Sequence, residues 1–338
     1  MLSEKELAAL NDLLSLVDVA TPAALRAAST LGVPDAFRGE TADLESLRAE
    51  TGVASAKMPY LLDALVRTGV LVERERSVYG LTARGALLRT DHAWSMRDAF
   101  ALADTEIAAW SELEHAVRTC GSGFEKAFGE SHRQYRARHA EEDIRMDRMH
   151  QAASRVDLYT LTRAYPWGAF RRIADIGGGT GTFLGGILKQ CPALQGTLFD
   201  LERMLERAPE VLARYGVHDR CRILPGDFFR DIPGDHDLYV LKAVLGGWDD
   251  DACIRILTGI RHAMPPGSRL LVIEPLMGAG SAYARGNLVQ LHLLVLYGGR
   301  YRGVDEYREM ASRAGLHVSR VIPRSTMPIV EMEISEGC

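Results

Sequence analysis

The chain has 338 residues, of which 47% are hydrophobic and 25% are charged, and its formal net charge is −5. This is the balance of a globular protein long enough for two domains, and the negative charge argues against a nucleic-acid partner, because basic residues supply most non-specific nucleic-acid affinity. The five cysteines are dispersed and form no C-x-x-C pair, which argues against disulfides and against a zinc or other metal site and favours a cytoplasmic location.

The first residues of the chain are acidic where a signal peptide would be basic, and no apolar run approaches membrane-spanning length. We therefore expect no membrane partner. From Glu4 to Leu31, apolar residues recur every three or four positions, which predicts amphipathic helices.

Residues 1–95 are predicted to form a helical winged-helix domain. Thr41 can cap a short helix that Gly52 ends, and a second helix with one apolar face follows at residues 55–71. Apolar and charged residues then alternate around a central Arg-Ser pair, which predicts a two-stranded wing.

A winged helix can lay its second helix in the major groove of DNA, so a ligand-sensing DNA-binding regulator is the non-enzymatic alternative. Here that helix carries one arginine, Arg67, on a mostly apolar surface. A groove-reading helix presents several basic and polar side chains to the base edges. We therefore expect the domain to serve dimerisation and not DNA binding.

Residues 96–168 have a charged, helical composition, and we expect them to connect the two halves of the chain; the family resemblance described below implies that they also line a substrate pocket. Across residues 169–338, short apolar runs alternate with longer helical patterns. Strand, helix, strand, helix is typical of a Rossmann-like, doubly wound parallel sheet. The predicted fold is therefore α/β, with the winged-helix domain preceding the sheet.

A glycine-rich turn carries the strongest functional signal. Asp175 closes an apolar strand, and Gly177, Gly179 and Gly181 open the helix that follows. Glycine lacks the Cβ that would obstruct a ligand, and the N–H groups at a helix start favour electron-rich groups. Asp200 ends the next strand, nineteen residues after Gly181, where a carboxylate can accept both hydroxyls of a ribose.

The spacing of these glycines distinguishes between two nucleoside cofactors. NAD sites use G-x-G-x-x-G, whereas this chain has G-x-G-x-G with an acid two residues before the first glycine, the form used by class I methyltransferases. A later strand ends in Gly226, Asp227 and Phe228. Asp227 can accept from an adenine amino group, and Phe228 can lie beside the ring. These features predict S-adenosylmethionine, or its product S-adenosylhomocysteine, as the ligand.

The order of motifs resembles that of the plant caffeic-acid-type O-methyltransferases and of bacterial relatives that modify polyketides, phenazines and anthracyclines. The shared segments are D-x-G-G-G-x-G at 175–181, F-D-L at 199–201, G-D-F-F at 226–229, L-K at 241–242, W-D-D at 248–250 and V-I-E at 272–274. The resemblance implies a homodimer that binds S-adenosylmethionine, with Leu201 and Lys242 among the cofactor contacts. It also implies a small-molecule acceptor pocket lined by residues that include Met149 and Trp248.

The chain departs from this family where the family holds its catalytic base. In O-methylating members an L-H-D-W segment supplies a His that deprotonates the acceptor, and two acids steer that His. Here Gly246 stands in place of the His and Gly247 in place of the Asp; Glu274 matches the first steering acid, and Tyr301 replaces the second. A general base contributes about a hundred- to ten-thousand-fold in rate. We expect the two missing side chains to open space at the acceptor pocket or to soften the loop.

Three accounts of the activity remain open. The first is methyl transfer, mainly by proximity and orientation, to an O or N acceptor that needs no strong base, in a small aromatic or polyketide-like intermediate. The second is methyl transfer with a relocated base, for which His292 is preferred over His150 and His132, with Glu274 as the retained acid. The third is a non-methylating step such as hydroxylation, decarboxylation or cyclisation at a retained cofactor site.

Overall fold

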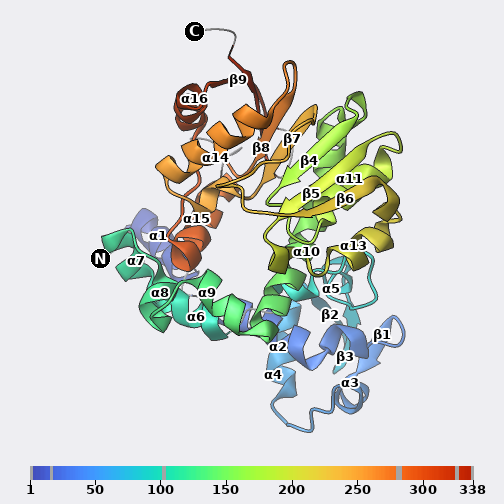
Figure 1. Ribbon diagram of the computed structural model, residues 1–338. Coiled ribbons are helices and arrows are strands. Elements are labelled where there is room, and N and C mark those ends of the chain that lie inside the picture. Colours follow the sequence, from blue (N-terminus) through green and yellow to red (C-terminus); the bar gives the residue numbers. More distant parts are fainter. Residues whose placement is uncertain (1–2, 16–17, 101–103, 279–283, 324–326, 336–338) are drawn as a thin grey trace. The chain divides into compact units, whose positions relative to one another are not determined.

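The computed structural model of the chain, shown in Figure 1, describes residues 3–15, 18–100, 104–278, 284–323 and 327–335. These residues divide into two compact units. Unit 1 comprises Met1–Ala103 and Glu141–Ala153, and unit 2 comprises Asp104–Ala140 and Ser154–Cys338. The residues predicted as a connector fall partly in each unit, and the predicted domain limits at residues 95 and 168 stay predictions.

Unit 1 contains a winged helix. Its elements are α1 (Glu4–Ser15), α2 (Ala20–Leu31), β1 (Thr41–Asp43), α3 (Leu44–Thr51), α4 (Met58–Arg67), β2 (Leu71–Glu75), β3 (Val78–Leu81) and α5 (Ala83–Ala86). The strands pair antiparallel in the order β1-β3-β2, and β2 and β3 form the predicted wing. The helix-turn-helix predicted before the wing is confirmed as α3 and α4. Leu47, Leu62 and Leu65 of these two helices lie in the buried core of the unit.

The start of α3 differs from the prediction. Thr41 opens β1 and does not cap the helix; the cap is Asp43, whose carboxylate accepts a hydrogen bond from the Ser46 N–H at 2.7 Å. Thr41 pairs with Gly80 of β3, and aspartate is the stronger N-cap of the two residue types. Gly52 ends the helix with a φ of 68°, as predicted.

The long helix α10 (Ala140–Ala164) contributes residues to both units. Among the residues that the structure describes, no helix combines the length and the apolar character needed to cross a membrane. The cysteines at positions 120, 191, 221 and 253 are free thiols, and Cys338 lies outside the described residues.

Unit 2 is built on a mixed sheet. Its strands are β4 (Arg172–Ile176), β5 (Gln195–Asp200), β6 (Cys221–Pro225), β7 (Leu238–Lys242), β8 (Arg269–Ile273), β9 (Leu316–Ile322) and β10 (Ile329–Ile334). They lie in the order β6-β5-β4-β7-β8-β10-β9. The first five are parallel to one another, whereas β10 runs antiparallel to both β8 and β9. The predicted Rossmann-like fold is confirmed, and the sheet is mixed at this edge, where β9 and β10 are joined by a short connection and pair antiparallel.

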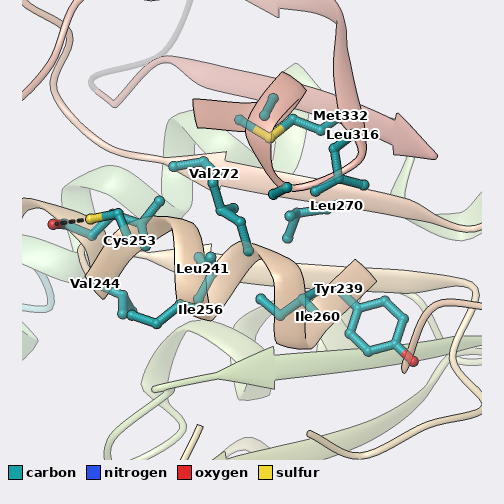
Figure 2. Packing of buried hydrophobic residues seen from close by; sticks show 14 of the residues in the cluster. Tyr239, Leu241, Val244, Cys253, Ile256, Ile260, Leu270, Val272, Leu316 and Met332 are labelled. Atoms are coloured by element: carbon teal, nitrogen blue, oxygen red, sulfur yellow. Dashed lines mark hydrogen bonds between the residues drawn. The ribbon is translucent and has the colours of Figure 1, made fainter. Parts of the chain in front are cut away.

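Helices cover both faces of this sheet. They are α11 (Thr182–Gln190), α12 (Glu202–Leu205), α13 (Ala208–Tyr215), α14 (Asp250–Ala263) and α16 (Val304–Arg313). Figure 2 shows the core under α14, where Ile256 and Ile260 pack with Tyr239, Leu241 and Val272. Residues of α11, α13 and the end of α10 form the core of the opposite face. The carboxyl ends of β4, β5 and β7 are thereby held on a rigid frame.

A separate group of helices completes unit 2. It consists of α6 (Asp104–Ser111), α7 (Leu113–Thr119), α8 (Gly123–Phe128), α9 (His132–Arg138) and α15 (Ala284–Tyr297). Ala109 and Phe124 pack with Val295 and Leu296 of α15 in a small buried core. The Ser122 hydroxyl donates to the Val295 carbonyl at 3.1 Å, so α8 and α15 are joined by a buried hydrogen bond as well as by packing.

Truncating Ile256 to Ala should destabilise the core in Figure 2, where this side chain is fully buried. We expect a loss of about 2–5 kcal/mol in the free energy of unfolding, because the removed methyl groups leave a cavity. Urea unfolding of the full chain measures the change. The control is Val117→Ala, at a side chain with 60% exposure, for which we expect less than about 0.5 kcal/mol. Equal effects of the two substitutions would contradict the assignment of this core.

Candidate active site

The glycine-rich turn follows β4 and leads into α11. Gly177, Gly179 and Gly181 have φ values of 72°, 57° and 78°, in the left-handed region that glycine adopts without strain. A Cβ at Gly177 would lie 2.9 Å from Cγ2 of Val244, so this position also has no room for a side chain. The turn therefore presents bare backbone at the edge of the sheet.

The Asp200 carboxylate lies at the end of β5, beside this turn. Oδ2 accepts from the Gly179 N–H at 2.9 Å, and Oδ1 accepts from the Leu201 N–H at 2.7 Å. Burial raises the pKa of Asp200, and the two backbone N–H groups oppose that rise. Each carboxylate oxygen can accept more than one hydrogen bond. Asp200 is thus fixed in orientation and can still accept the two hydroxyls of a ribose.

Asp175 is a buried carboxyl, and neither of its oxygens has a hydrogen-bond partner among the described residues. Burial raises its pKa to about 7; Lys242 opposes the rise, and Asp200 adds to it. The Lys242 Nζ lies 3.7 Å from Oδ2 of Asp157 on α10. A buried carboxylate that lacks partners is costly, and a cationic ligand in the turn would offset that cost. This arrangement fits S-adenosylmethionine, which carries positive charge.

Aromatic rings line the region after β6. The Phe228 and Trp248 rings lie 5.8 Å apart at an interplanar angle of 88°, and a Cβ at Gly177 would lie 3.7 Å from Cε1 of Phe228. The Asp227 carboxylate accepts from the Phe229 N–H at 2.9 Å. The residues predicted to contact adenine therefore lie next to the glycine-rich turn.

Gly226 is required at the start of this segment. A Cβ there would lie 2.3 Å from Cε2 of Phe199, which is closer than two non-bonded carbon atoms can approach. The Gly226 N–H donates to the Asp200 carbonyl at 2.9 Å. The end of β6 is thereby tied to the end of β5.

The segment after β7 forms a tight turn, a single 3-10 turn at Leu245–Gly247. The Gly246 N–H donates to Oε1 of Glu274 at 3.0 Å, and the Tyr307 hydroxyl donates to Oε2 at 2.7 Å. Burial raises the pKa of Glu274, and these two donors oppose that rise. Both oxygens of the acid predicted as catalytic are thus engaged in holding the turn.

Arg302 is a site residue that the sequence analysis missed. This buried guanidinium donates to the Trp248 carbonyl at 2.7 Å and to the Leu245 carbonyl at 3.1 Å, and it pairs with Asp250 at 2.7 Å. The available signal was the segment at residues 298–302, where the resembled family has G-G-x-E-R and this chain has G-G-R-Y-R, so that the final arginine is kept as Arg302. Its contacts with the Leu245 and Trp248 carbonyls brace the turn in addition to the contact of Glu274.

Gly246 and Gly247 do not leave empty space at their Cβ positions, so the expectation that they open space at the acceptor pocket was wrong. A Cβ at Gly246 would lie 2.9 Å from Cε1 of Tyr301 and 3.0 Å from Cδ2 of Leu293, and one at Gly247 would lie 2.5 Å from Nη2 of Arg133. Burial, with Glu274 nearby, raises the pKa of Tyr301 well above its ordinary value. Tyr301 therefore fills the volume beside Gly246 with a neutral phenol.

His292 lies on α15 with its ring 6.1 Å from the ring of Trp110 on α6. Burial lowers its pKa, and the buried Glu106 opposes that change, so the ring is neutral near pH 7 and can accept a proton. Its helical neighbour Leu293 is the residue that contacts the Gly246 position. Successive residues of a helix point about 100° apart, so the two side chains leave α15 in different directions.

The other candidates from the sequence lie in different surroundings. The His132 ring is buried 4.6 Å from the Phe124 ring and 5.2 Å from the Tyr297 ring, in unit 2. Met149 and His150 belong to the part of α10 that lies in unit 1. The roles predicted for these residues, and the base role of His292, stay predictions.

Comparison with known proteins gives the family. A model described as an O-methyltransferase domain matches residues 110–317, and one described as an O-methyltransferase dimerisation domain matches residues 14–91. The phenazine O-methyltransferase of Lysobacter antibioticus is 34% identical over 309 residues, covering 91% of each protein. The aclacinomycin 10-hydroxylase of Streptomyces purpurascens is 31% identical over 326 residues, covering 93% of this chain and 86% of the relative.

Solved structures agree with this result. One is an O-methyltransferase from neocarzinostatin biosynthesis in complex with S-adenosylmethionine and 2-hydroxy-5-methyl naphthoic acid. It matches with a TM-score of 0.79 and 31% identity, over 95% of this chain and 98% of that one.

The protonation of Asp175 can be tested by Asp175→Asn. The folded chain keeps the Asp175 proton up to a pKa of about 7, against an ordinary value of 3.8, so the folded state binds more protons than the unfolded state and its stability falls as pH rises through this window. Asn cannot ionise. We expect the stability advantage of the variant over the native chain to be larger at pH 8 than at pH 5, by on the order of 2–3 kcal/mol.

Thermal unfolding without cofactor at both pH values measures this difference. The control is Asp219→Asn, at a carboxylate whose side chain is 86% exposed, for which we expect no such pH dependence. The assignment of a raised pKa to Asp175 would be wrong if its variant and the native chain responded equally to pH.

Proposed function

Because this chain belongs to the S-adenosylmethionine-dependent O-methyltransferase family, we propose that it methylates an O or N acceptor on a small aromatic or polyketide-like natural-product intermediate. Relatives whose printed names include a phenazine O-methyltransferase and a riboflavin-type N,N-dimethyltransferase support both acceptor atoms. The proposal rests on one observation. The glycine-rich turn and Asp200 are intact, whereas Gly246 lacks the expected base and has the Tyr301 ring in the adjacent space.

The residues at the strand ends take the cofactor roles. Asp200 accepts the ribose hydroxyls, and Asp227 accepts from the adenine amino group beside Phe228. The turn of Gly177, Gly179 and Gly181 admits the nucleoside close to the backbone, with Leu201, Gly226 and Lys242 on the walls of the site. Asp175 balances the positive charge. When bound, S-adenosylmethionine supplies an electrophilic methyl group on sulfur.

Activation of the acceptor follows from the residues around Gly246. Tyr301 is protonated at neutral pH and can donate a hydrogen bond but cannot remove a proton. Glu274 is occupied by the turn and by Tyr307. Neither residue replaces the family base, so the rate depends on holding the acceptor in line with the methyl group, which alone can supply a large effective molarity. This favours an aromatic nitrogen, a carboxylate or an acidic enol over a neutral phenol.

Two other accounts of the activity are each supported by a specific observation. A neutral His292 near the buried Glu106 is able to act as a relocated base for a distant part of the acceptor. A non-methylating step is supported by the aclacinomycin 10-hydroxylase, whose overall identity to this chain, at 31%, approaches that of the methyltransferases. We place both below methyl transfer without a strong base.

We also propose an oligomeric state and a cellular location for the enzyme. A dimerisation domain at residues 14–91 supports a homodimer. Free, dispersed thiols support a cytoplasmic location. The apolar residues of α4 are buried in the core of unit 1, and its exposed residues include the acid Asp63 as well as Arg67, which argues against nucleic-acid binding.

Incubation with methyl-labelled S-adenosylmethionine tests the class of reaction. The acceptors are matched aromatic compounds that bear a ring nitrogen, a carboxylate, an acidic enol or a neutral phenol. We expect label in the first three and at least about tenfold less in the phenol, which is mostly protonated at neutral pH. Cofactor binding with no label transfer to any acceptor would leave the non-methylating account.

Restoring the expected base tests the coupling between Gly246 and Tyr301. Gly246→His alone should lower the unfolding temperature, because its Cβ would lie 2.9 Å from the Tyr301 ring. The double variant Gly246→His/Tyr301→Glu replaces both residues by those of the resembled family. It should be more stable than Gly246→His and should methylate a neutral phenol about tenfold or more faster than the native chain.

Tyr301→Glu is the matched control, since it changes the second position without adding a base. Thermal unfolding and initial rates with a neutral phenol measure both effects. A Gly246→His chain as stable as the native one would show that the two positions are independent.

A further inference from the structure

Arg133 of α9 reaches the turn after β7. Its Nη2 donates to the Gly247 carbonyl at 3.0 Å, and that same atom occupies the space that a side chain at Gly247 would need. The guanidinium carbon lies 4.4 Å from the centre of the Trp248 ring and 5.6 Å from that of the Tyr297 ring. Two aromatic faces and one carbonyl therefore hold this cation in a defined position.

The charge of Arg133 is not balanced within its surroundings. In the described part of unit 2, no carboxylate lies within ion-pair distance of this guanidinium, whereas Arg300 and Arg302 both pair with Asp250. Burial lowers the pKa of Arg133, and the positive charge of Arg203, close to Asp200, acts in the same direction. The guanidinium nevertheless stays protonated. A partly desolvated cation without a counter-ion favours an anionic ligand.

The side chain keeps an exposed surface and uses few of its N–H donors. A planar guanidinium suits bidentate binding of a carboxylate. Gly247 also stands where the resembled family carries an Asp. The exchange therefore removes a negative charge from a position that lies against the Arg133 guanidinium.

We propose that Arg133 binds a carboxylate of the acceptor, so that the substrate class of this enzyme is an aromatic carboxylate. This inference rests on the proposed methyl transfer and names the part of the acceptor that the site recognises. Trp248 and Tyr297 flank the bound carboxylate and provide flat apolar surfaces for the attached ring. Arg133 is thus a specificity-determining residue that contacts the turn at Gly247.

The test compares 1-naphthoate with 1-naphthamide, which have the same ring and nearly the same shape but differ in charge. Titration calorimetry on the full chain saturated with S-adenosylhomocysteine gives both dissociation constants. We expect the native chain to prefer the carboxylate by about tenfold or more, the usual range for a charge-assisted hydrogen bond. Arg133→Met should abolish this preference, and Arg133→Lys should keep part of it.

Arg138→Met is the matched control, because Arg138 lies on the same helix but pairs with Glu130. It should keep the full preference. The affinity for S-adenosylhomocysteine should be the same in all variants.

Each other result has a distinct meaning. A preference that survives in Arg133→Met, or a native chain that binds neither naphthalene compound, would overturn the role of Arg133. Loss of S-adenosylhomocysteine binding in Arg133→Met alone would also overturn it, because the residue would then serve the cofactor. A native chain that fails to bind S-adenosylhomocysteine would instead overturn the proposed function.

Discussion

The buried carboxylate of Glu274 fixes the turn on which the candidate active site depends. It stands at the end of β8 and accepts hydrogen bonds from the Gly246 N–H and from the Tyr307 hydroxyl of α16. Such donors offset the cost of burying a carboxylate. Arg302 braces the same turn through the Leu245 and Trp248 carbonyls. The backbone after β7 is therefore set by two buried charged groups, whatever side chains the turn itself carries.

With the backbone held in this way, the loss of two side chains changes the chemistry of the site and not its shape. Tyr301 fills the position beside Gly246, and Arg133 fills the one beside Gly247. In this chain the positions where the resembled family carries a base and an acid therefore lie against a phenol and a guanidinium. Because each glycine and its filling side chain are in contact, their effects are expected to be coupled.

The parts of the site that the sequence predicted are those that depend on local order. Asp175 and Asp200 lie at the carboxyl ends of β4 and β5, Asp227 follows β6 by two residues, and such strand ends meet at one edge of a parallel sheet. The filling of the turn could not be predicted, because Arg133 and Gly247 are 114 residues apart in the chain. No periodicity or motif spacing in the sequence predicts a contact between Arg133 and Gly247.

The prediction that Thr41 caps α3 was wrong for a local reason. Thr41 and Asp43 are both capping residue types, and the pairing of β1 with β3 decided between them. The antiparallel edge of the sheet was not predicted either, because none of the motifs lies on β9 or β10 and none specifies how β10 pairs. In both cases pairing with a distant strand, which the local sequence does not encode, determined the outcome.

The charges of the site also limit where the carboxylate bound by Arg133 can act in the reaction. Transfer of a methyl group from a sulfonium to an anion neutralises both charges, so a desolvated site favours it when the attacking atom is left without strong donors. A guanidinium on the attacking oxygen itself would stabilise the ground state more than the transition state and would slow the transfer. Binding through Arg133 therefore assists most when the carboxylate is a remote group, whose binding energy positions a different atom of the acceptor against the methyl group.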